Sequence, residues 1–153
     1  MALQGSIGLL KDPVAETLLT STIPARLGYI WTDGTPRVVP IWFHWTGEQF
    51  VLGSPAKAPK LKALSVNPKV ALSIDDHAVW PHKVLLVRGD ATVEMQNDVV
   101  HEYTLSAARY FGEDQGGAWV NTLRGKPMAR IAITPNWVGV LDFETRFPSA
   151  LGL

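Results

Sequence analysis

The feature that most restricts the fold is a series of β-rich runs separated by tight-turn residues. RLGYIWT (26–32) leads into the turn TDGTP, RVVPIWFHW (37–45) follows, and the turn TGEQ then leads into FVLG (50–53). Asp-Gly and Thr-Gly pairs between β-branched and aromatic residues are typical of hairpins, so these runs predict an antiparallel meander. Both faces of the middle run are apolar except for His44, and this strand is therefore expected to be covered on both faces.

Further strands follow in the second half of the chain. The same β-rich character is found in KVALSID (69–75), KVLLVRGDATVEM (83–95), MARIAIT (128–134) and WVGVLDF (137–143). Gly89 interrupts the longest run, as expected for a bulge or bend in a closed sheet. The pattern predicts a mainly β fold of one domain over residues 1–153, an antiparallel barrel of about six strands with two or three attached helices.

Helices are predicted where cap residues and helical spacing coincide. They are expected over 13–21 after Asp12, over about two turns from Pro59 to Asn67-Pro68, from the caps Asn97 and Asp98 to Gly112, and over 118–123. Gly116-Gly117, between the last two of these, is interpreted as a loop.

Composition excludes several classes of protein. The 14 basic and 14 acidic residues balance, so the chain has no global basic footprint for nucleic acid. The absence of cysteine excludes disulfides and thiolate nucleophiles, and the four histidines have no metal-ligand spacing, so no metal site is expected. No apolar run approaches the ~18 residues that cross a bilayer, and the N-terminus does not resemble a signal peptide. We expect a soluble, cytoplasmic protein that does not bind membranes.

One stretch carries local positive charge. Between Glu48 and Asp75 the chain has no carboxylate but four lysines, Lys57, Lys60, Lys62 and Lys69. Lys60 falls in the first turn of the helix that Pro59 begins, where free backbone N–H groups and the helix dipole favour an anion such as phosphate. Ser54 would add a hydroxyl and Arg37 a guanidinium. The alternative is that these lysines coat an exposed short helix and bind nothing.

Three segments, in their order along the chain, carry a family resemblance: DGTPRVVPIW (33–42), KLKALSVNPKVAL (60–72) and VRGDATV (87–93). Together they resemble the pyridoxamine 5'-phosphate oxidase-like, flavin-binding split-barrel family, over residues 13–143. The resemblance implies the fold of that family, a six-stranded split barrel that forms homodimers with the cofactor at the subunit interface.

The resemblance also implies a set of site residues. Arg37 and Lys60 would contact the cofactor phosphate. The isoalloxazine ring and ribityl chain would lie along Val38, Val39, Pro40, Trp42, Gly53 and Ser54.

The chain departs from the family pattern at three places. Many members have Ser-Arg-Lys where this chain has Ala58-Pro59-Lys60, so two phosphate ligands are absent, and Lys57 and Ser54 are the candidates to replace them. Trp42 stands where the oxidase itself has a lysine, and its C-terminal arginine motif has no clear match, Arg146 being the nearest residue. These departures argue against a true pyridoxamine phosphate oxidase.

The sequence shows no acid, base or nucleophile constellation, which fits an enzyme whose cofactor carries the chemistry. The leading hypothesis is an FMN-dependent oxidoreductase that passes hydride between bound flavin and a small organic substrate. A close variant uses the 5-deazaflavin coenzyme. The alternatives are a flavin- or haem-binding carrier or sensor without turnover, and a dimer with a degenerate phosphate site that binds something else.

Overall fold

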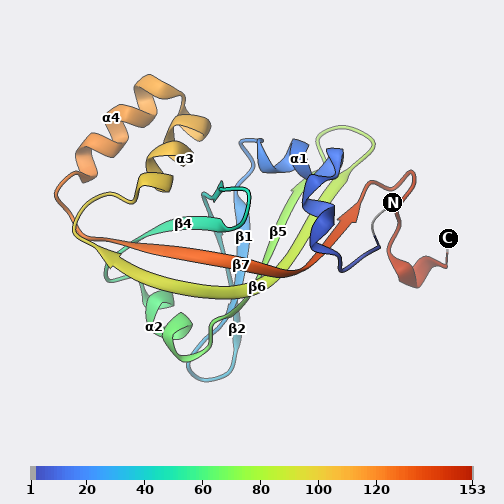
Figure 1. Cartoon of the computed structure of the whole chain (residues 1–153), viewed down its shortest axis with the longest axis horizontal. Helices are drawn as coiled ribbons and strands as arrows, with labels where there is room; N and C mark the ends of the chain where they lie inside the picture. The colour runs from blue at the N-terminus through green and yellow to red at the C-terminus, as the bar shows by residue number, and fades with distance from the viewer. Residues whose placement is uncertain (1–2, 153) are drawn as a thin grey trace.

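The computed structural model describes residues 3–152, in which one antiparallel sheet of seven strands curls into a half-barrel. The strands are β1 (Ala25–Ile30), β2 (Pro36–Ile41), β3 (His44–Trp45), β4 (Phe50–Pro55), β5 (Lys69–Asp76), β6 (Lys83–Gln96) and β7 (Met128–Leu141). Their order across the sheet is β2-β1-β5-β6-β7-β4-β3. The two longest strands, β6 and β7, pair with each other and run along the length of the molecule (Figure 1).

The two edge strands of the sheet, β2 and β3, follow each other directly in the chain. Only Trp42 and Phe43 separate Ile41 from His44, so the Cα atoms of Ile41 and His44 lie at most about 11 Å apart. The sheet must therefore curl until its two edges approach each other. It does not close, because β2 pairs with β1 and β3 with β4, and no ladder joins β2 to β3 in the part of the chain that the structure describes. We call this opening between β2 and the β3–β4 pair the seam.

The structure corrects the predicted strands in three details. The described chain has seven strands rather than six. Both predicted hairpins form, β1 with β2 and β3 with β4, but the run 37–45 divides into β2 and β3 at opposite edges of the sheet. The predicted meander is therefore wrong in its middle strand, because no single strand pairs with both neighbours. The runs 128–134 and 137–143, by contrast, form the single strand β7.

The predicted bulge at Gly89 is confirmed. The register between β6 and β7 shifts between Arg88 and Gly89, and a Cβ added at Gly89 would lie 2.3 Å from the carbonyl oxygen of Thr134. Pro135 lies opposite Gly89 at the same irregularity. Proline is tolerated at a bulge because the ladder is already interrupted there. Pro135 therefore does not end β7, which is why two sequence runs form one strand.

The described residues contain four α-helices, one at each of the four predicted helical segments, so the expected total of two or three was too low. They are α1 (Pro13–Leu19), α2 (Pro59–Val66), α3 (His101–Phe111) and α4 (Glu113–Leu123), with short 3-10 helices η1 (Ile7–Lys11) and η2 (Ser149–Leu151). The predicted starts of the first two are confirmed. The Asp12 carboxylate accepts a hydrogen bond from the Val14 N–H at 3.0 Å, and Pro59 is the first residue of α2. The first helix ends at Leu19, two residues before the predicted end.

The loop interpretation of Gly116-Gly117 is wrong, because both glycines lie inside α4. A Cβ added at Gly116 would lie 2.5 Å from the carbonyl oxygen of Ala107, so the glycine allows α3 and α4 to approach closely. Glycine is a poor helix former, so helix propensity does not predict the first turns of α4. The predicted caps of α3 are also wrong, since its N-cap is Val100.

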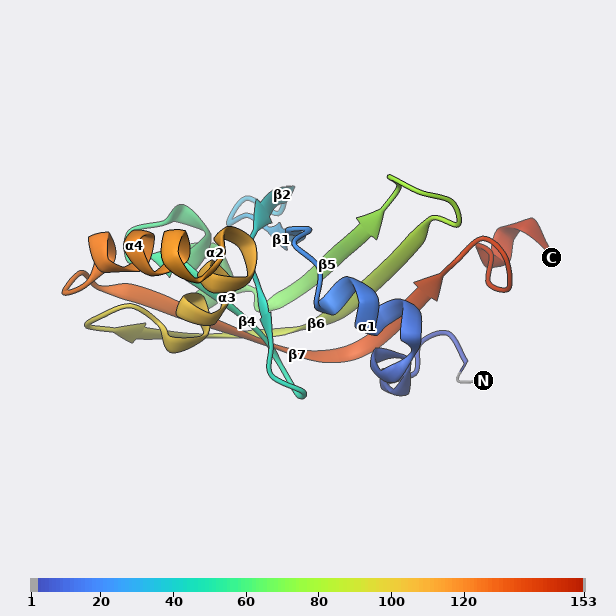
Figure 2. The same cartoon turned by 90° about the horizontal axis from the view of Figure 1, so that it is seen from above.

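The core has two parts. The main one lies between the curled sheet and α1, and its largest fully buried side chains include Leu18, Leu27, Phe43, Phe50 and Ile131. The smaller one joins α3 and α4 to β4 and β7 through Val51, Val100, Ala107, Val120, Met128 and Ala132. Figure 2 shows the consequence: the pair α3–α4 lies at one end of the long strands, and α1 lies toward the other end.

The edge strand β2 is not covered on both faces as predicted. Its Val38 side chain is 70 % exposed, and most of the strand is accessible. The prediction is wrong for the single chain because β2 lies at the edge of the sheet and the core contacts only one side of it. None of the helices in the described part of the chain combines the length and the hydropathy needed to span a membrane.

Candidate functional site

A cavity of about 710 Å³ opens at the seam, between β2 and β4, beneath α3 and α4. Six of the nine predicted site residues line this β2–β4 cavity: Val39, Pro40, Trp42, Gly53, Ser54 and Lys60. They come from β2 and the residue that follows it, from β4, and from the start of α2. The volume lies in the range of ligand pockets, about 300–1,000 Å³. The failure of the sheet to close thus creates a site of cofactor size.

The end of the cavity next to Pro55 has an unsatisfied hydroxyl. Ser54 is 1 % exposed, and its Oγ has no hydrogen-bond partner among the described residues. Leaving a buried hydroxyl unpaired costs about 1–3 kcal/mol. A ligand group that reached this hydroxyl would remove this cost.

The same end of the cavity carries the ammonium group of Lys60. This lysine lies in the first turn of α2, it is half-buried, and burial lowers its pKa. No ion pair is found for it among the described residues. The N-cap of α2, Ala58, provides no side-chain hydrogen bond, so the first backbone N–H groups of the helix have no cap. A free helix N-terminus beside a half-buried ammonium favours a bound anion.

Another part of the cavity lining is aromatic. The Trp42 indole stacks on Tyr110, with ring centroids 5.0 Å apart and an interplanar angle of 7°, and it contacts Tyr103 and Phe111 at 5.8 and 4.8 Å. Trp119 of α4 donates a hydrogen bond from Nε1 to the Tyr103 hydroxyl at 2.8 Å. Of this cluster, Trp42, Tyr103 and Trp119 line the cavity, which therefore has a wall suited to a flat heterocycle.

Helix α3 is held over the cavity by polar contacts with the chain before β1 and after β2. The Arg109 guanidinium donates to the carbonyl oxygens of Ser21 and Phe43, and the Tyr110 hydroxyl donates to the carbonyl oxygen of Ile23. Arg109 also lies over the Phe43 ring, 4.8 Å from its centroid. These contacts fix the aromatic wall against the sheet.

Three predicted site residues lie outside the β2–β4 cavity in the single chain. Arg37 lies over the Trp31 ring at 4.1 Å and lines a separate hollow with Tyr29 and Lys69. Val38 lines a third hollow, on the outer face of the sheet. Lys57 lines none of these three cavities. The structure therefore brings Ser54 and Lys60 together but does not bring Arg37 to them.

Arg146, the residue nearest to a match for the arginine motif, and His44, the polar residue of the run 37–45, also lie elsewhere. Arg146 forms an ion pair with the Asp12 carboxylate at the start of α1. His44 on β3 is half-buried, and burial, followed by the nearby charge of Arg109, lowers its pKa. Neither residue lines the β2–β4 cavity, and nor does any other histidine.

Two histidines that are separated in the sequence meet in the fold. The ring centroids of His77 and His82 are 4.5 Å apart, and His77 Nε2 lies 3.2 Å from Asp75 Oδ2. Within residues 3–152, however, no group of three or more His, Cys, Asp or Glu is arranged to hold a metal ion.

The sequence did not indicate several of the lining residues, among them Tyr103, Trp119, Lys126 and Met128. The first two look like ordinary apolar positions of amphipathic helices. Lys126, in the loop before β7, follows Gly125 as a lone lysine, which carries no signal without the fold. Their approach to β4 depends on the packing of α3 and α4, which no local pattern reveals.

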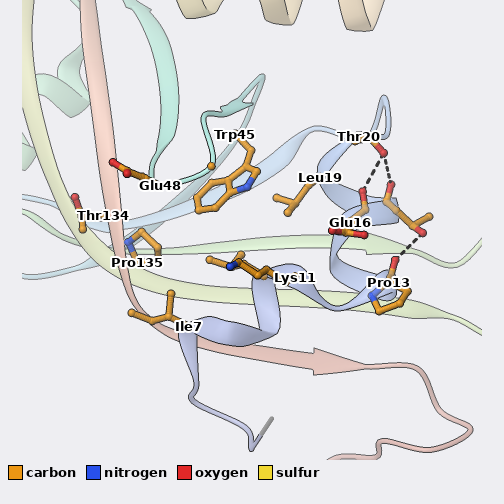
Figure 3. Close-up of a pocket in the computed structure, with 13 residues that line it drawn as sticks. Ile7, Lys11, Pro13, Glu16, Leu19, Thr20, Trp45, Glu48, Thr134 and Pro135 are labelled. Atoms are coloured by element: carbon orange, nitrogen blue, oxygen red, sulfur yellow. Dashed lines mark hydrogen bonds between the residues drawn. The ribbon is translucent and has the colours of Figure 1, made fainter. Parts of the chain in front are cut away.

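Another cavity, of about 930 Å³, lies away from these residues, between α1 and the β3–β4 turn. In Figure 3 the Trp45 ring lies between Leu19 and Pro135, with Lys11 below it. Glu16 and Glu48 are the acidic residues of its lining. It contains none of the predicted site residues, and its lining includes no buried polar atom without a partner. We therefore place the candidate site in the β2–β4 cavity.

Comparison with known proteins identifies the family. Residues 12–142 match the family model described as pyridoxamine 5'-phosphate oxidase. The chain belongs to this family. The match covers β1 to β7 and all residues of the β2–β4 cavity, and it confirms the resemblance found in the sequence. No curated protein matches the chain.

Solved structures similar to the chain share the fold of the family. An F420 reductase is 25 % identical, with a TM-score of 0.61 over 81 % of this chain and 94 % of that chain. A conserved hypothetical protein from Mycobacterium tuberculosis is 19 % identical, with a TM-score of 0.73 over 100 % and 92 %. HutZ, a haem storage protein from Vibrio cholerae, is 17 % identical, with a TM-score of 0.59 over 86 % and 93 %.

Proposed function

We propose that the chain binds a phosphate-bearing flavin in the β2–β4 cavity and acts as a flavin-dependent oxidoreductase. The main support for the proposal is that one cavity combines residues suited to an anion with aromatic residues. The lining includes Ser54, whose buried hydroxyl has no partner, and the half-buried Lys60, and it also includes the aromatic residue Trp42. A phosphate group suits the first two residues, and a flat ring suits the aromatic part of the lining.

The chain's own residues would bind and orient the cofactor. Lys60 and the free N–H groups of α2 would hold the phosphate, and Ser54 would donate a hydrogen bond to it. The open edge of β2 presents unpaired backbone groups along Val39 to Ile41, which would bond to the polar edge of the ring. When bound, a flavin supplies the hydride chemistry, so the cavity needs no acid or base of its own.

The cofactor is FMN or the 5-deazaflavin coenzyme. Membership of the family supports a flavin, and the similarity to an F420 reductase supports the deazaflavin variant. Haem is the weaker candidate for this cavity even though a haem storage protein shares the fold, because no histidine lines the cavity to ligate iron.

We also propose that the chain works as a homodimer with the cofactor at the subunit interface. The exposed face of β2, with Val38 70 % exposed, supports this arrangement. The separation of Arg37 from Lys60 also supports a homodimer. If a second subunit completes the site, the two predicted phosphate ligands need not meet within one chain.

Titration of the purified protein with FMN and with the deazaflavin coenzyme, followed by quenching of cofactor fluorescence, tests the proposal. We expect saturable binding of one of them, weakened about tenfold or more in Lys60→Ala, because a charge-assisted hydrogen bond is lost. Lys62→Ala is the matched control, since Lys62 is exposed on the same helix and does not line the cavity. Failure to quench either cofactor would refute the site.

Turnover separates an enzyme from a carrier. The holo-protein is mixed anaerobically with reduced nicotinamide or a reducible dye, and the flavin absorbance is followed. Reduction and reoxidation of the bound flavin over many cycles is the expected result. A bound flavin that stays oxidised with every donor tried would favour the carrier.

A further inference from the structure

The loop between α4 and β7 brings a second ammonium group to the anion end of the β2–β4 cavity. Lys126 lines this cavity, as Lys60 does. Lys60 follows β4 in the chain and Lys126 precedes β7, and these two strands pair with Pro55 opposite Met128. Lys60 follows Pro55 by five residues, and Lys126 precedes Met128 by two. Both cations therefore approach the same end of that strand pair, next to Ser54.

The charges at this end are not balanced by the protein. The lining of the cavity contains two lysines and no carboxylate. In the part of the chain that the structure describes, no ion pair involves Lys60 or Lys126. An anion bound in the cavity would be attracted by both ammonium groups. The arrangement is therefore complementary to a group with more than one negative charge.

The backbone that carries Lys126 is held in place. The N–H of Gly125 donates to the Asp98 carboxylate at 2.9 Å, and the N–H of Lys126 donates to the Leu123 carbonyl oxygen at 3.1 Å. Gly125 has φ +78°, a conformation that other residues rarely adopt, and Pro127 restricts the chain on the other side. Lys126 is thus presented from a fixed loop rather than from a free surface segment.

We infer that Lys126 is the second cation of the phosphate site and works with Lys60 and Ser54. This inference rests on the proposed function. It assigns to Lys126 the role for which the sequence suggests Lys57, which does not line the cavity. Asp98 is a positioning residue in this scheme, because it holds the loop and does not reach the cavity.

The test compares two ligands that differ only in the phosphate, FMN and riboflavin. Dissociation constants are measured by fluorescence quenching for the wild type, Lys126→Ala and Lys57→Ala, at low and moderate salt. We expect Lys126→Ala to weaken FMN about three- to tenfold and to leave riboflavin unchanged, since an exposed charge contributes less than a buried one. Lys57→Ala should change neither constant.

Two results would overturn the inference while leaving the proposed function intact. One is an FMN affinity that Lys126→Ala does not change, and the other is an equal loss for FMN and riboflavin, which would indicate a general disturbance of the cavity. Circular dichroism of each variant checks the fold.

A second measurement keeps the two proposals separable if the wild type binds no flavin. Amide shifts in ¹H–¹⁵N spectra of the full chain are followed during titration with inorganic pyrophosphate. Saturable shifts at Ser54, Lys60 and Lys126 together, absent in Lys126→Ala, would support the anion site even though the flavin proposal had failed. The inference would be refuted by shifts at Ser54 and Lys60 without Lys126, or by none at all.

Discussion

Tyr103 of α3 packs directly against Gly53 of β4. A Cβ added at Gly53 would lie 2.6 Å from Tyr103 Cδ2 and 3.0 Å from Met128 Sδ. Both neighbours line the β2–β4 cavity, so this glycine determines how closely α3 approaches the sheet at the aromatic wall. The family resemblance places Gly53 beside the cofactor. The structure adds a packing role that needs no ligand.

Gly53→Ala should therefore destabilise the fold. The added methyl group has no free space, and overpacking of this kind costs about 1–3 kcal/mol. Urea denaturation gives the change in the free energy of unfolding. Gly117→Ala is the control, because Gly117 lies in α4 with nothing within 4 Å of an added Cβ. There alanine should stabilise the chain by about 0.5–1 kcal/mol. Similar changes in the two variants would contradict the packing role.

The hydrogen bond from Trp119 Nε1 to the Tyr103 hydroxyl couples α4 to α3 above the cavity. A double-mutant cycle with Tyr103→Phe and Trp119→Phe removes the two partners separately and together. We expect a coupling energy of about 0.5–1 kcal/mol in the free energy of unfolding, at the low end for a hydrogen bond because Trp119 is 42 % exposed. Strictly additive effects would mean that this bond does not join the two helices.

The sequence predicts most of the local structure. Asp12, Pro59 and Gly89 act on their own neighbours in the chain, through a cap, a first helical turn and a bulge, so their roles follow from residue type and spacing. The division of the run 37–45 is different in kind. It depends on the curl of the sheet, which places β2 and β3 at opposite edges, and no pattern within the run marks it.

The site divides in the same way. Ser54 and Lys60 are separated by six positions, and the sequence places both at the anion site. Lys126 is more than sixty residues away and reaches the cavity only because β7 pairs with β4. Long-range pairing of this kind decides which lone lysine lines the cavity, and a single sequence does not reveal it.

Asp12 has two separable roles, as the N-cap of α1 and as the partner of Arg146. Asp12→Asn keeps a capping oxygen but loses the ion pair, whereas Asp12→Ala loses both. We expect a loss of about 1–3 kcal/mol for Asn and about 1 kcal/mol more for Ala, measured by urea denaturation at pH 7. Equal losses would mean that the cap contributes nothing.

The contribution of this ion pair should depend on pH. The hydrogen bond from Arg146 holds the pKa of Asp12 below its usual range. A carboxylate with a lowered pKa in the folded state stabilises the fold above its ordinary pKa of about 4, and this contribution is lost as the pH falls toward the lower, folded-state value. The difference in unfolding free energy between wild type and Asp12→Asn should therefore be constant above about pH 5 and shrink below pH 4. A difference that is the same at pH 3 and pH 7 would show that the charge is not involved.

Burial lowers the pKa of Lys60, and this gives the proposed phosphate site its own pH dependence. The ammonium form binds phosphate, so FMN affinity should fall as the pH rises toward the ordinary lysine pKa of about 10.4, and the fall should begin below that value. Lys60→Arg keeps its charge throughout, so its FMN affinity should change less over the same range. Dissociation constants from fluorescence quenching between pH 7 and pH 10 provide the measurement, with riboflavin as the reference, because titration of the ring affects both ligands and cancels in their ratio. If the ratio for wild type and for Lys60→Arg followed the same curve, Lys60 would not be the titrating group of the site.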